Sequence, residues 1–246
     1  MSKLAIIGGT GLTKLKDLEI IRQQNLRTPY GKTSSPITYG SYHGKSVVFL
    51  ARHGSHHTIS PHKINYRANI WSLKELGIRN VIAIASVGSI NPTMQPKDLV
   101  IPHQIIDYTW SREQTFFAED LSHVTHIDFT EPYCENLRGK LLATAQNFKF
   151  KVHSQGVYGA TQGPRLETAA EINRMERDGC DIVGMTGMPE AALARELELC
   201  YATCAVVANQ AAGRSSTKIS MPEIEANMCE SIEYVYQLLS KVIIEM

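Results

Sequence analysis

Glu167 and Asn209 are the residues whose types and surroundings most directly suggest a chemical function. Glu167 follows a turn at residues 163–165, and Asn209 ends an apolar run over residues 205–208. A carboxylate only accepts hydrogen bonds, whereas a carboxamide both donates and accepts them. Together the two side chains suit the polar edge of a 6-oxopurine, where Glu167 accepts from the ring N1–H and Asn209 donates to N7 or O6.

Two loops carry residues that suit a phosphate group. Residues 8–12 read Gly-Gly-Thr-Gly-Leu, in which glycines let backbone N–H groups approach an anion and the Thr10 hydroxyl adds a donor. The loop is not G-x-G-x-x-G, because Lys14 stands at the third glycine position, and a plain tight turn explains it equally well. Arg52 and His53 follow an apolar segment, where the guanidinium can make paired contacts to phosphate and His53 adds a donor. A surface Arg–His pair is the alternative.

Two further apolar segments run into small or hydroxylated residues. Ser86 begins the sequence Ser-Val-Gly-Ser, and Thr186 precedes a helix that starts with a proline and whose N-terminal amides favour anions. Either residue could instead be only a helix cap. Four such loops in one chain favour an anion site over four unrelated turns.

A histidine cluster in the first third of the chain raises the question of a metal. The cluster comprises His53, His56, His57 and His62. These spacings do not give H-E-x-x-H, and no nearby Cys or Asp completes a usual zinc set. We therefore expect no metal site.

The composition is ordinary for a folded soluble protein, and the length fits one large α/β domain or two small ones. The chain has 246 residues, of which 43% are hydrophobic and 20% charged, and residues 1–246 contain no linker, repeat or low-complexity segment. A net charge of +1 implies no broad basic surface, so nucleic acid is not an expected partner. No apolar stretch approaches the roughly 18 residues of a membrane span, and the N-terminus reaches glycines too early for a signal peptide.

The five cysteines are expected to be buried free thiols. They are Cys134, Cys180, Cys200, Cys204 and Cys229, an odd number without a C-x-x-C motif. A disulfide or metal role is the alternative. Free thiols indicate a reducing compartment, so we expect a cytoplasmic protein.

The candidate residues must be positioned by strands that end at one edge of a sheet. Apolar runs and helical periodicity predict alternating strands and helices. Strands are expected at residues 3–7, 46–51, 80–85, 98–101, 153–158, 181–184 and 199–208, and helices at residues 65–76, 132–148, 168–177, 189–196 and 221–245. This order predicts an α/β fold, a single domain with a central parallel or mixed β-sheet flanked by helices. Ligands of such folds bind at the carboxyl ends of strands, where the candidate residues fall.

Several motifs taken together resemble the trimeric purine nucleoside phosphorylase family. They lie at residues 6–12, 51–54, 62–69, 163–165 and 185–190. The resemblance covers about residues 3–240, and it is strongest to the methylthioadenosine and methylthioinosine phosphorylases. It implies a central mixed β-sheet, a homotrimer that can pair into a dimer of trimers, and replacement of the purine at C1′ by phosphate. Phosphate is then a co-substrate, and no cofactor is expected.

The resemblance also implies a function for each candidate residue. The residues that would hold phosphate are Thr10, Arg52, His53, Ser86 and Thr186. Met185 would contact the ribose, Leu166 would pack on the base, and the polar edge of the base would bind to Glu167 and Asn209. His126 would reach the 5′ pocket of a neighbouring subunit, and Met221 would line that pocket. The family commonly has threonine at the position of Ala85, so the donor from that loop is uncertain by sequence and Ser86 is the substitute.

Two departures from the methylthioadenosine phosphorylase pattern favour a 6-oxopurine. Those enzymes usually carry Asp-x-Asp where this chain has Asn209-Gln210-Ala211, and many have serine at the position of Glu167. An ionised Glu167 would face the lone pair of adenine N1, but it would accept from the N1–H of hypoxanthine. Within the 6-oxopurine nucleosides the expected substrate is methylthioinosine rather than inosine, because the chain resembles the methylthio branch more closely. The apolar Met221 would also suit a methylthio group.

Other interpretations stay open at this point. Glu167 could cap the following helix, and Asn209 could close a turn. The chain could also be a methylthioadenosine phosphorylase, an inosine or guanosine phosphorylase, a nucleoside-binding protein without turnover, or a hydrolase.

Overall fold

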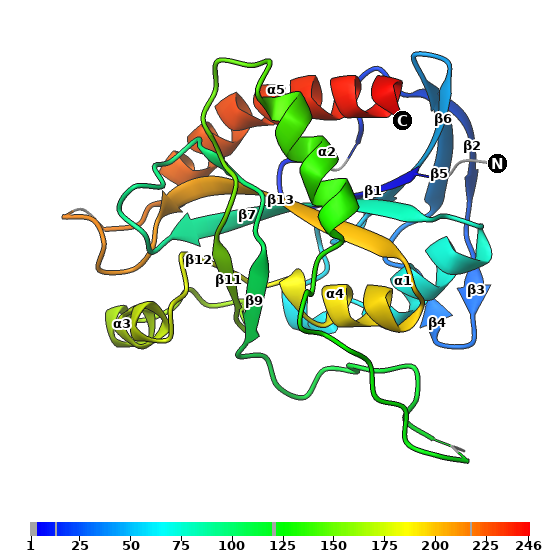
Figure 1. Ribbon diagram of the computed structural model, residues 1–246, viewed down its shortest axis with the longest axis horizontal. Coiled ribbons are helices and arrows are strands. Elements are labelled where there is room, and N and C mark those ends of the chain that lie inside the picture. Colours follow the sequence, from blue (N-terminus) through cyan, green and yellow to red (C-terminus); the bar gives the residue numbers. More distant parts are fainter. Residues whose placement is uncertain (1–3, 13, 120–121, 217) are drawn as a thin grey trace.

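A single twisted sheet organises the chain in the computed structural model, which describes residues 4–12, 14–119, 122–216 and 218–246. Eleven strands of this described part join in the sheet, and its main path runs β10-β8-β13-β7-β1-β6-β5-β2. β11 and β12 branch from this path at β7, and β9 pairs with β11. Figure 1 shows helices on both faces of the sheet.

The elements have the following bounds. The sheet strands are β1 (Leu4–Gly8), β2 (Glu19–Gln24), β5 (Ile37–Tyr42), β6 (Lys45–Ala51), β7 (Asn80–Ser89), β8 (Leu99–Val100), β9 (Gln104–Asp107), β10 (Val152–His153), β11 (Val157–Ala160), β12 (Ile182–Gly184) and β13 (Cys200–Gln210). A separate hairpin consists of β3 (Arg27–Thr28) and β4 (Gly31–Lys32), and the helices are η1 (Pro61–Lys63), α1 (Tyr66–Glu75), α2 (Glu135–Ala145), α3 (Ala169–Arg177), α4 (Gly187–Glu196) and α5 (Met221–Glu245).

The sheet is mixed, as the family resemblance implies. β13, β7, β1 and β6 are parallel to one another, whereas β5 is antiparallel to β6, and β12 is antiparallel to β7. The parallel strands are buried on both faces, which explains why their sequences are continuous apolar runs rather than alternating ones.

Alternate residues of the central strands enter two separate hydrophobic cores. In β7, Val81 and Ala83 pack in the core that also contains residues of α1 and α4. Ile82 and Ile84 point to the other face, whose core contains residues of α2 and α5. Both faces of the sheet are thereby covered, and the open edge for ligands is the line of strand ends.

The elements expected from the sequence are found with small shifts at their ends. The long helix over residues 221–245 has the expected bounds, and α3 begins one residue later than expected because Thr168 is its N-cap. The strand expected at residues 3–7 is observed as β1, and residue 3 lies outside the described residues. The extended segment expected at 153–158 is divided between β10 and β11.

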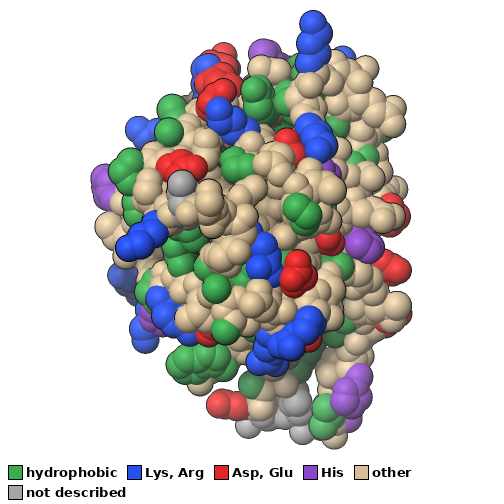
Figure 2. Space-filling view, turned by 90° about the vertical axis from the view of Figure 1, so that its left-hand side faces the viewer, with side chains coloured by type: hydrophobic (Ala, Val, Ile, Leu, Met, Phe, Trp, Pro, Cys, Tyr) green, Lys and Arg blue, Asp and Glu red, His purple; other side chains and the backbone are tan. Residues whose placement is uncertain are grey.

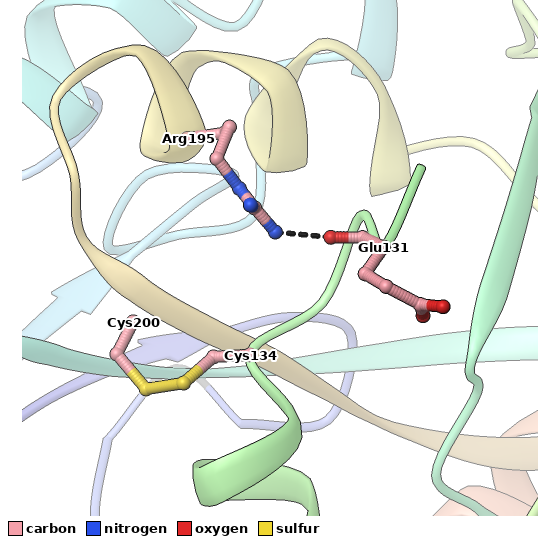
Figure 3. Close-up of a disulfide and its surroundings, with 4 residues drawn as sticks. All are labelled: Glu131, Cys134, Arg195 and Cys200. Carbon is pink, nitrogen blue, oxygen red and sulfur yellow. Dashed lines mark hydrogen bonds between the residues drawn. A yellow bond between two sulfur atoms is a disulfide. The ribbon is translucent and has the colours of Figure 1, made fainter. Parts of the chain in front are cut away.

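The expectation of five buried free thiols is wrong for three of them. Cys134 and Cys200 form a disulfide, with their Cα atoms 5.0 Å apart, and Cys229 is exposed, whereas Cys180 and Cys204 are free and buried. Figure 3 shows the disulfide joining the start of α2 to the start of β13. The two cysteines are 66 positions apart and meet because the Cys134 N–H donates to the Tyr201 carbonyl. The argument from free thiols to a reducing compartment therefore loses its basis.

The described residues were compared with the features of a membrane span, and one face of the molecule with those of a charged patch. Among the described residues no helix is long and apolar enough to cross a membrane. The carboxyl ends of β7 and β13 point to the left of Figure 1, toward the face shown in Figure 2. On that face Lys and Arg side chains are interspersed with Asp, Glu and apolar groups.

Candidate active site

A cavity of about 450 Å³ opens at the carboxyl ends of the strands. Its walls are formed by the segments that follow β1, β6, β11, β12 and β13, by the last residues of β7 and by the start of α5. The sequence-predicted residues that line it are Thr10, Arg52, His53, Ser86, Leu166, Glu167, Met185, Thr186, Asn209 and Met221. Residues from both ends of the chain thus meet in one site of the size of a small ligand.

Arg52 is held inside this site by a carboxylate that sequence reasoning did not assign. The side chains of Arg52 and Glu190 are 1% and 0% exposed. Arg52 Nε donates to Glu190 Oε2 at 2.7 Å, and Nη2 donates to Oε1 at 2.8 Å. Nη1 donates to the Ile84 carbonyl at 2.8 Å. Because a guanidinium has five N–H groups, two remain for a ligand.

The Arg52–Glu190 pair balances its own charge. Burial alone would lower the pKa of Arg52, but the attraction and hydrogen bonds of Glu190 raise it above its ordinary value. Tyr201 also donates to Glu190, at 2.8 Å. Glu190 ends the Met-Pro-Glu sequence in the first turn of α4, but local sequence does not pair it with Arg52, because the two residues are 138 positions apart.

His53 is neutral and oriented by the backbone. Burial and the neighbouring Arg52 lower the pKa of His53 to about 4. Its Nδ1 lies 2.8 Å from the carbonyl oxygen of Ile59, so the proton of the neutral ring is on Nδ1 and is donated there. Nε2 is then an acceptor, and the donor expected from His53 is used by the protein itself.

Thr186 supplies a hydroxyl that the helix after it does not use. It occupies the N-cap position of α4, and within the described chain its side chain makes no capping hydrogen bond. The interpretation of Thr186 as only a helix cap is therefore not supported. Ser86 lies within β7, not at a helix start, because this strand continues to Ser89.

The carboxylate of Glu167 is oriented by a threonine. Thr161 Oγ1 donates to Glu167 Oε1 at 2.7 Å. The next helix is capped by Thr168, which forms a reciprocal capping box with Glu171. Glu167 is therefore not the helix cap, and its second carboxylate oxygen can accept from a ligand.

Asn209 stands where β13 departs from regular pairing with β7. The register shifts between Val207 and Asn209, and the Asn209 amide nitrogen donates to the Gln210 carbonyl at 2.7 Å. One of its two amide hydrogens is used in this local contact, so the other is available to a ligand. Asn227 of α5 donates to the Ala208 carbonyl at 2.8 Å and fixes the strand end from the outside.

The apolar part of the cavity lies at the start of α5. Ile219, Met221 and Ile224 line it there, and Leu166 lines it on the side of Glu167. Met221 is 58% exposed and Leu166 42%, so both leave apolar surface open at the cavity. His126 is exposed on the segment between β9 and α2 and is not among the described lining residues.

Comparison with known proteins agrees with this geometry. The sequence profile of the phosphorylase superfamily matches residues 3–244. This chain belongs to the phosphorylase superfamily. It is 53% identical over 243 residues to the probable S-methyl-5′-thioinosine phosphorylase of Pseudomonas syringae pv. tomato, with 99% of each chain covered.

Two further members of the superfamily differ in the substrate that their names give. The 6-oxopurine nucleoside phosphorylase of Pyrococcus furiosus is 49% identical over 97% of this chain and 91% of its own. The methylthioadenosine phosphorylase of Schistosoma mansoni, solved with adenine, has a TM-score of 0.95 at 32% identity, covering 100% of this chain and 92% of its own.

Proposed function

We propose that this phosphorylase cleaves S-methyl-5′-thioinosine with phosphate, releasing hypoxanthine and 5-methylthioribose 1-phosphate. The observation that carries the proposal is the pairing of Glu167 and Asn209 in the cavity that also holds the Arg52–His53 loop. Relatives at about half identity are named as methylthioinosine and 6-oxopurine nucleoside phosphorylases, which supports the same substrate class.

The phosphate side works by positioned donors. Arg52 offers two N–H groups, Thr10, Ser86 and Thr186 offer hydroxyls, and His53 Nε2 accepts from the P–OH of monohydrogen phosphate. The anion then lies beside C1′ of the ribose. As the C1′–N9 bond breaks, the negative phosphate stabilises the developing oxocarbenium charge, and one of its oxygens forms the new bond to C1′.

The base side stabilises the leaving purine. The electron pair of the C1′–N9 bond moves into the purine ring, and Asn209 donates a hydrogen bond to N7 or O6, where this charge develops. The departing purine anion takes up one proton, which balances the P–OH proton that the new phosphate ester gives up. Glu167 accepts from N1–H, which hypoxanthine has and adenine lacks. Because Thr161 already donates to one oxygen of Glu167, the carboxylate is held as an acceptor.

The 5′ side favours a methylthio group over a hydroxyl. Ile219, Met221 and Ile224 present apolar surface. A thioether packs against such residues by dispersion, whereas a hydroxyl would lose hydrogen bonds to water.

A substrate panel tests the proposal. The protein is incubated with methylthioinosine, methylthioadenosine or inosine, each with and without phosphate, and the released base is identified. We expect hypoxanthine from methylthioinosine, in a phosphate-dependent reaction, as the fastest process. Adenine as the main product, or base release without phosphate, would contradict the proposal.

Methylthioadenosine is the second candidate substrate. The structural similarity to the Schistosoma mansoni enzyme solved with adenine favours it. The same panel separates the two substrates, because they release different bases.

We further propose that the protein acts as a homotrimer in the cytoplasm. The segment between β9 and α2 projects from the sheet in Figure 1 and carries the exposed His126, Trp110 and Val124, which supports contact with another copy. The sugar phosphate product is charged and does not cross a membrane unaided, so a cell keeps it only when the reaction takes place inside. This favours the cytoplasm. Light scattering should give three times the monomer mass, and cell fractionation should place the activity with cytosolic markers.

A further inference from the structure

A half-buried arginine outside the cavity connects two of the loops that line it. Arg112 lies in the segment between β9 and α2 and is not among the described lining residues of the cavity. Its Nη2 donates to the carbonyls of Thr161 and Gln162, at 3.1 and 2.8 Å. Its Nη1 donates to the carbonyls of Met185 and Met188, at 2.9 Å and 2.6 Å. Three backbone carbonyls from two loops and one from the first turn of α4 thus accept hydrogen bonds from one guanidinium.

The first of these loops carries the base-reading residue. It follows β11, and Thr161 in it donates to the Glu167 carboxylate. Arg112 Nε also donates to the Gln162 side chain at 3.0 Å, so the loop is held through its backbone and a side chain. A displacement of Thr161 would therefore disturb the hydrogen bond that orients the Glu167 carboxylate.

The second loop carries the phosphate-side hydroxyl. It follows β12, and Thr186 lies between the two methionines whose carbonyls accept from Arg112. The two loops also touch directly, since a Cβ on Gly163 would lie 2.4 Å from Met185 Sδ. The close approach at Gly163 leaves little freedom once Arg112 is in place.

Only an arginine has the donor geometry for this position. Its planar fork presents five N–H groups in fixed directions, whereas a lysine has a single nitrogen. Catalytic groups must be held within a fraction of an ångström of their working positions. Arg112 meets this need for both loops at once.

We propose that Arg112 is a positioning residue that sets the placement of Glu167 relative to Thr186, and with it the purine relative to the phosphate. This inference rests on the proposed function, because it assigns the two loops to the two substrates. It adds a specificity determinant that makes no contact with either ligand.

The test compares Arg112→Lys and Arg112→Ala with an arginine that anchors the same segment elsewhere. Arg195 of α4 donates to the backbone carbonyl of Glu131, as Figure 3 shows, so Arg195→Gln is the matched control. Steady-state kinetics give kcat and KM for phosphate and for both methylthio nucleosides, and thermal melting reports stability. Wild-type turnover in the same assay tests the proposed function separately.

We expect Arg112→Lys to lower kcat/KM for methylthioinosine by roughly 10²-fold. The KM for phosphate should rise and the preference for the 6-oxopurine nucleoside should shrink in the same variant. Arg195→Gln should stay within about 3-fold of wild type, as expected for a control outside the site. Guanidinium ion at millimolar concentration should restore part of the activity of Arg112→Ala.

If the wild type is active, two results would overturn the proposal. One is an activity loss in Arg112→Lys that matches the melting-temperature loss and leaves the base preference intact. The other is an Arg112→Lys variant that is as active as wild type. If the wild type turns over no nucleoside, titration calorimetry with hypoxanthine and inorganic phosphate replaces kinetics. Equal cooperativity between the two ligands in wild type and Arg112→Lys would then refute the inference.

Discussion

Asn209 has a single amide hydrogen left for the substrate, and this makes its chemistry sensitive to substitution. The other hydrogen is donated to the Gln210 carbonyl. Similarly, one carboxylate oxygen of Glu167 already accepts a hydrogen bond from the Thr161 hydroxyl. Each side chain therefore offers a defined hydrogen-bonding group to the purine edge, an acceptor from Glu167 and a donor from Asn209.

Asn209→Asp should reduce methylthioinosine turnover more than methylthioadenosine turnover. An ionised aspartate has no donor for O6 or N7, and it faces their lone pairs. We expect kcat/KM for methylthioinosine to fall about 10²-fold, as for loss of one donor to a developing charge. Competition between the two nucleosides in one assay measures the change in preference. Equal losses on both substrates would remove the role given to Asn209.

Glu190→Gln tests whether the buried pair is the reason that Arg52 stays in place. The substitution leaves a buried guanidinium without its counter-charge, which typically costs about 3–5 kcal/mol of unfolding free energy. Phosphate can supply the missing negative charge. Phosphate should therefore raise the melting temperature of the variant by more than that of wild type.

A matched control for this experiment is Glu233→Gln. Glu233 pairs with Lys16 on the surface, where both side chains are 53% exposed. Such pairs contribute little to stability, so this variant should respond to phosphate as wild type does. Equal phosphate shifts in all three proteins would argue against a compensating anion at Arg52.

The lowered pKa of His53 predicts a loss of stability in mild acid. Between pH 6.5 and about 4 the unfolded chain binds a proton at this residue that the folded chain does not bind. Stability therefore falls as the pH falls through this window, by about 3 kcal/mol when fully developed. Urea unfolding of wild type and His53→Asn at pH 7 and pH 4.5 should show a smaller pH effect in the variant.

His57 contributes to the same pH effect, because burial lowers its pKa as well. His57→Asn should therefore be measured beside His53→Asn. A pH effect in His53→Asn that equals that of wild type would show that the His53 ring is not the source.

The strands and helices differ in how well local sequence predicts them. β7 and β13 were predictable because long apolar runs between polar residues leave little alternative, and α3 was predictable from Gly179, which stands two residues after its end. β2 was missed because its residues are exposed along nearly the whole strand, so the sequence has no alternation to read. β5 was also missed, because Gly40 within it and Pro36 just before it are residues typical of turns and loops.

The loops at the strand ends were predictable as a set, but their internal contacts were not. Glycine and hydroxyl residues after apolar runs placed nearly every site residue at one edge. The ion pair between Arg52 and Glu190 joins residues far apart in the chain, and so do the hydrogen bonds from Arg112 to two loops. Side-chain pairing over such separations is set by the topology and leaves no local periodicity.

Gly9→Ala tests how closely the first loop packs on the sheet. A Cβ on Gly9 would lie 2.4 Å from the Ile84 carbonyl oxygen and 3.0 Å from Arg52 Nη1. The loop must then move away from β7, and we expect the KM for phosphate to rise about 10-fold or more as the site is misplaced. Gly139→Ala in α2, where a Cβ would meet nothing within 4 Å, is the control. It should leave kinetics unchanged and raise stability slightly, by up to about 1 kcal/mol.

Taken as a whole, the fold brings the two ends of the chain to one place. Thr10 follows the first strand and Met221 begins the last helix, and both line the same cavity. No short fragment contains all the parts of the site. The one covalent crosslink found in the described chain, between Cys134 and Cys200, ties α2 to the amino end of β13, at the end of that strand away from the cavity.

Removing that disulfide should lower the stability of the whole molecule. Closing a 66-residue loop restricts the unfolded chain, which contributes about 2–4 kcal/mol. Cys134→Ser or a reducing agent should lower the melting temperature by roughly 5–15 °C, given the usual dependence for a chain of this size. Cys229→Ser, which removes an exposed free thiol, should have no effect. A melting temperature insensitive to reduction would contradict this expectation.

The same bond also closes residues 134–200 into a covalent ring that contains both Glu167 and Thr186. A protease that cuts one peptide bond inside the ring opens it without separating the protein into two pieces. Such a nicked enzyme would migrate as one band on a non-reducing gel and as two bands after reduction.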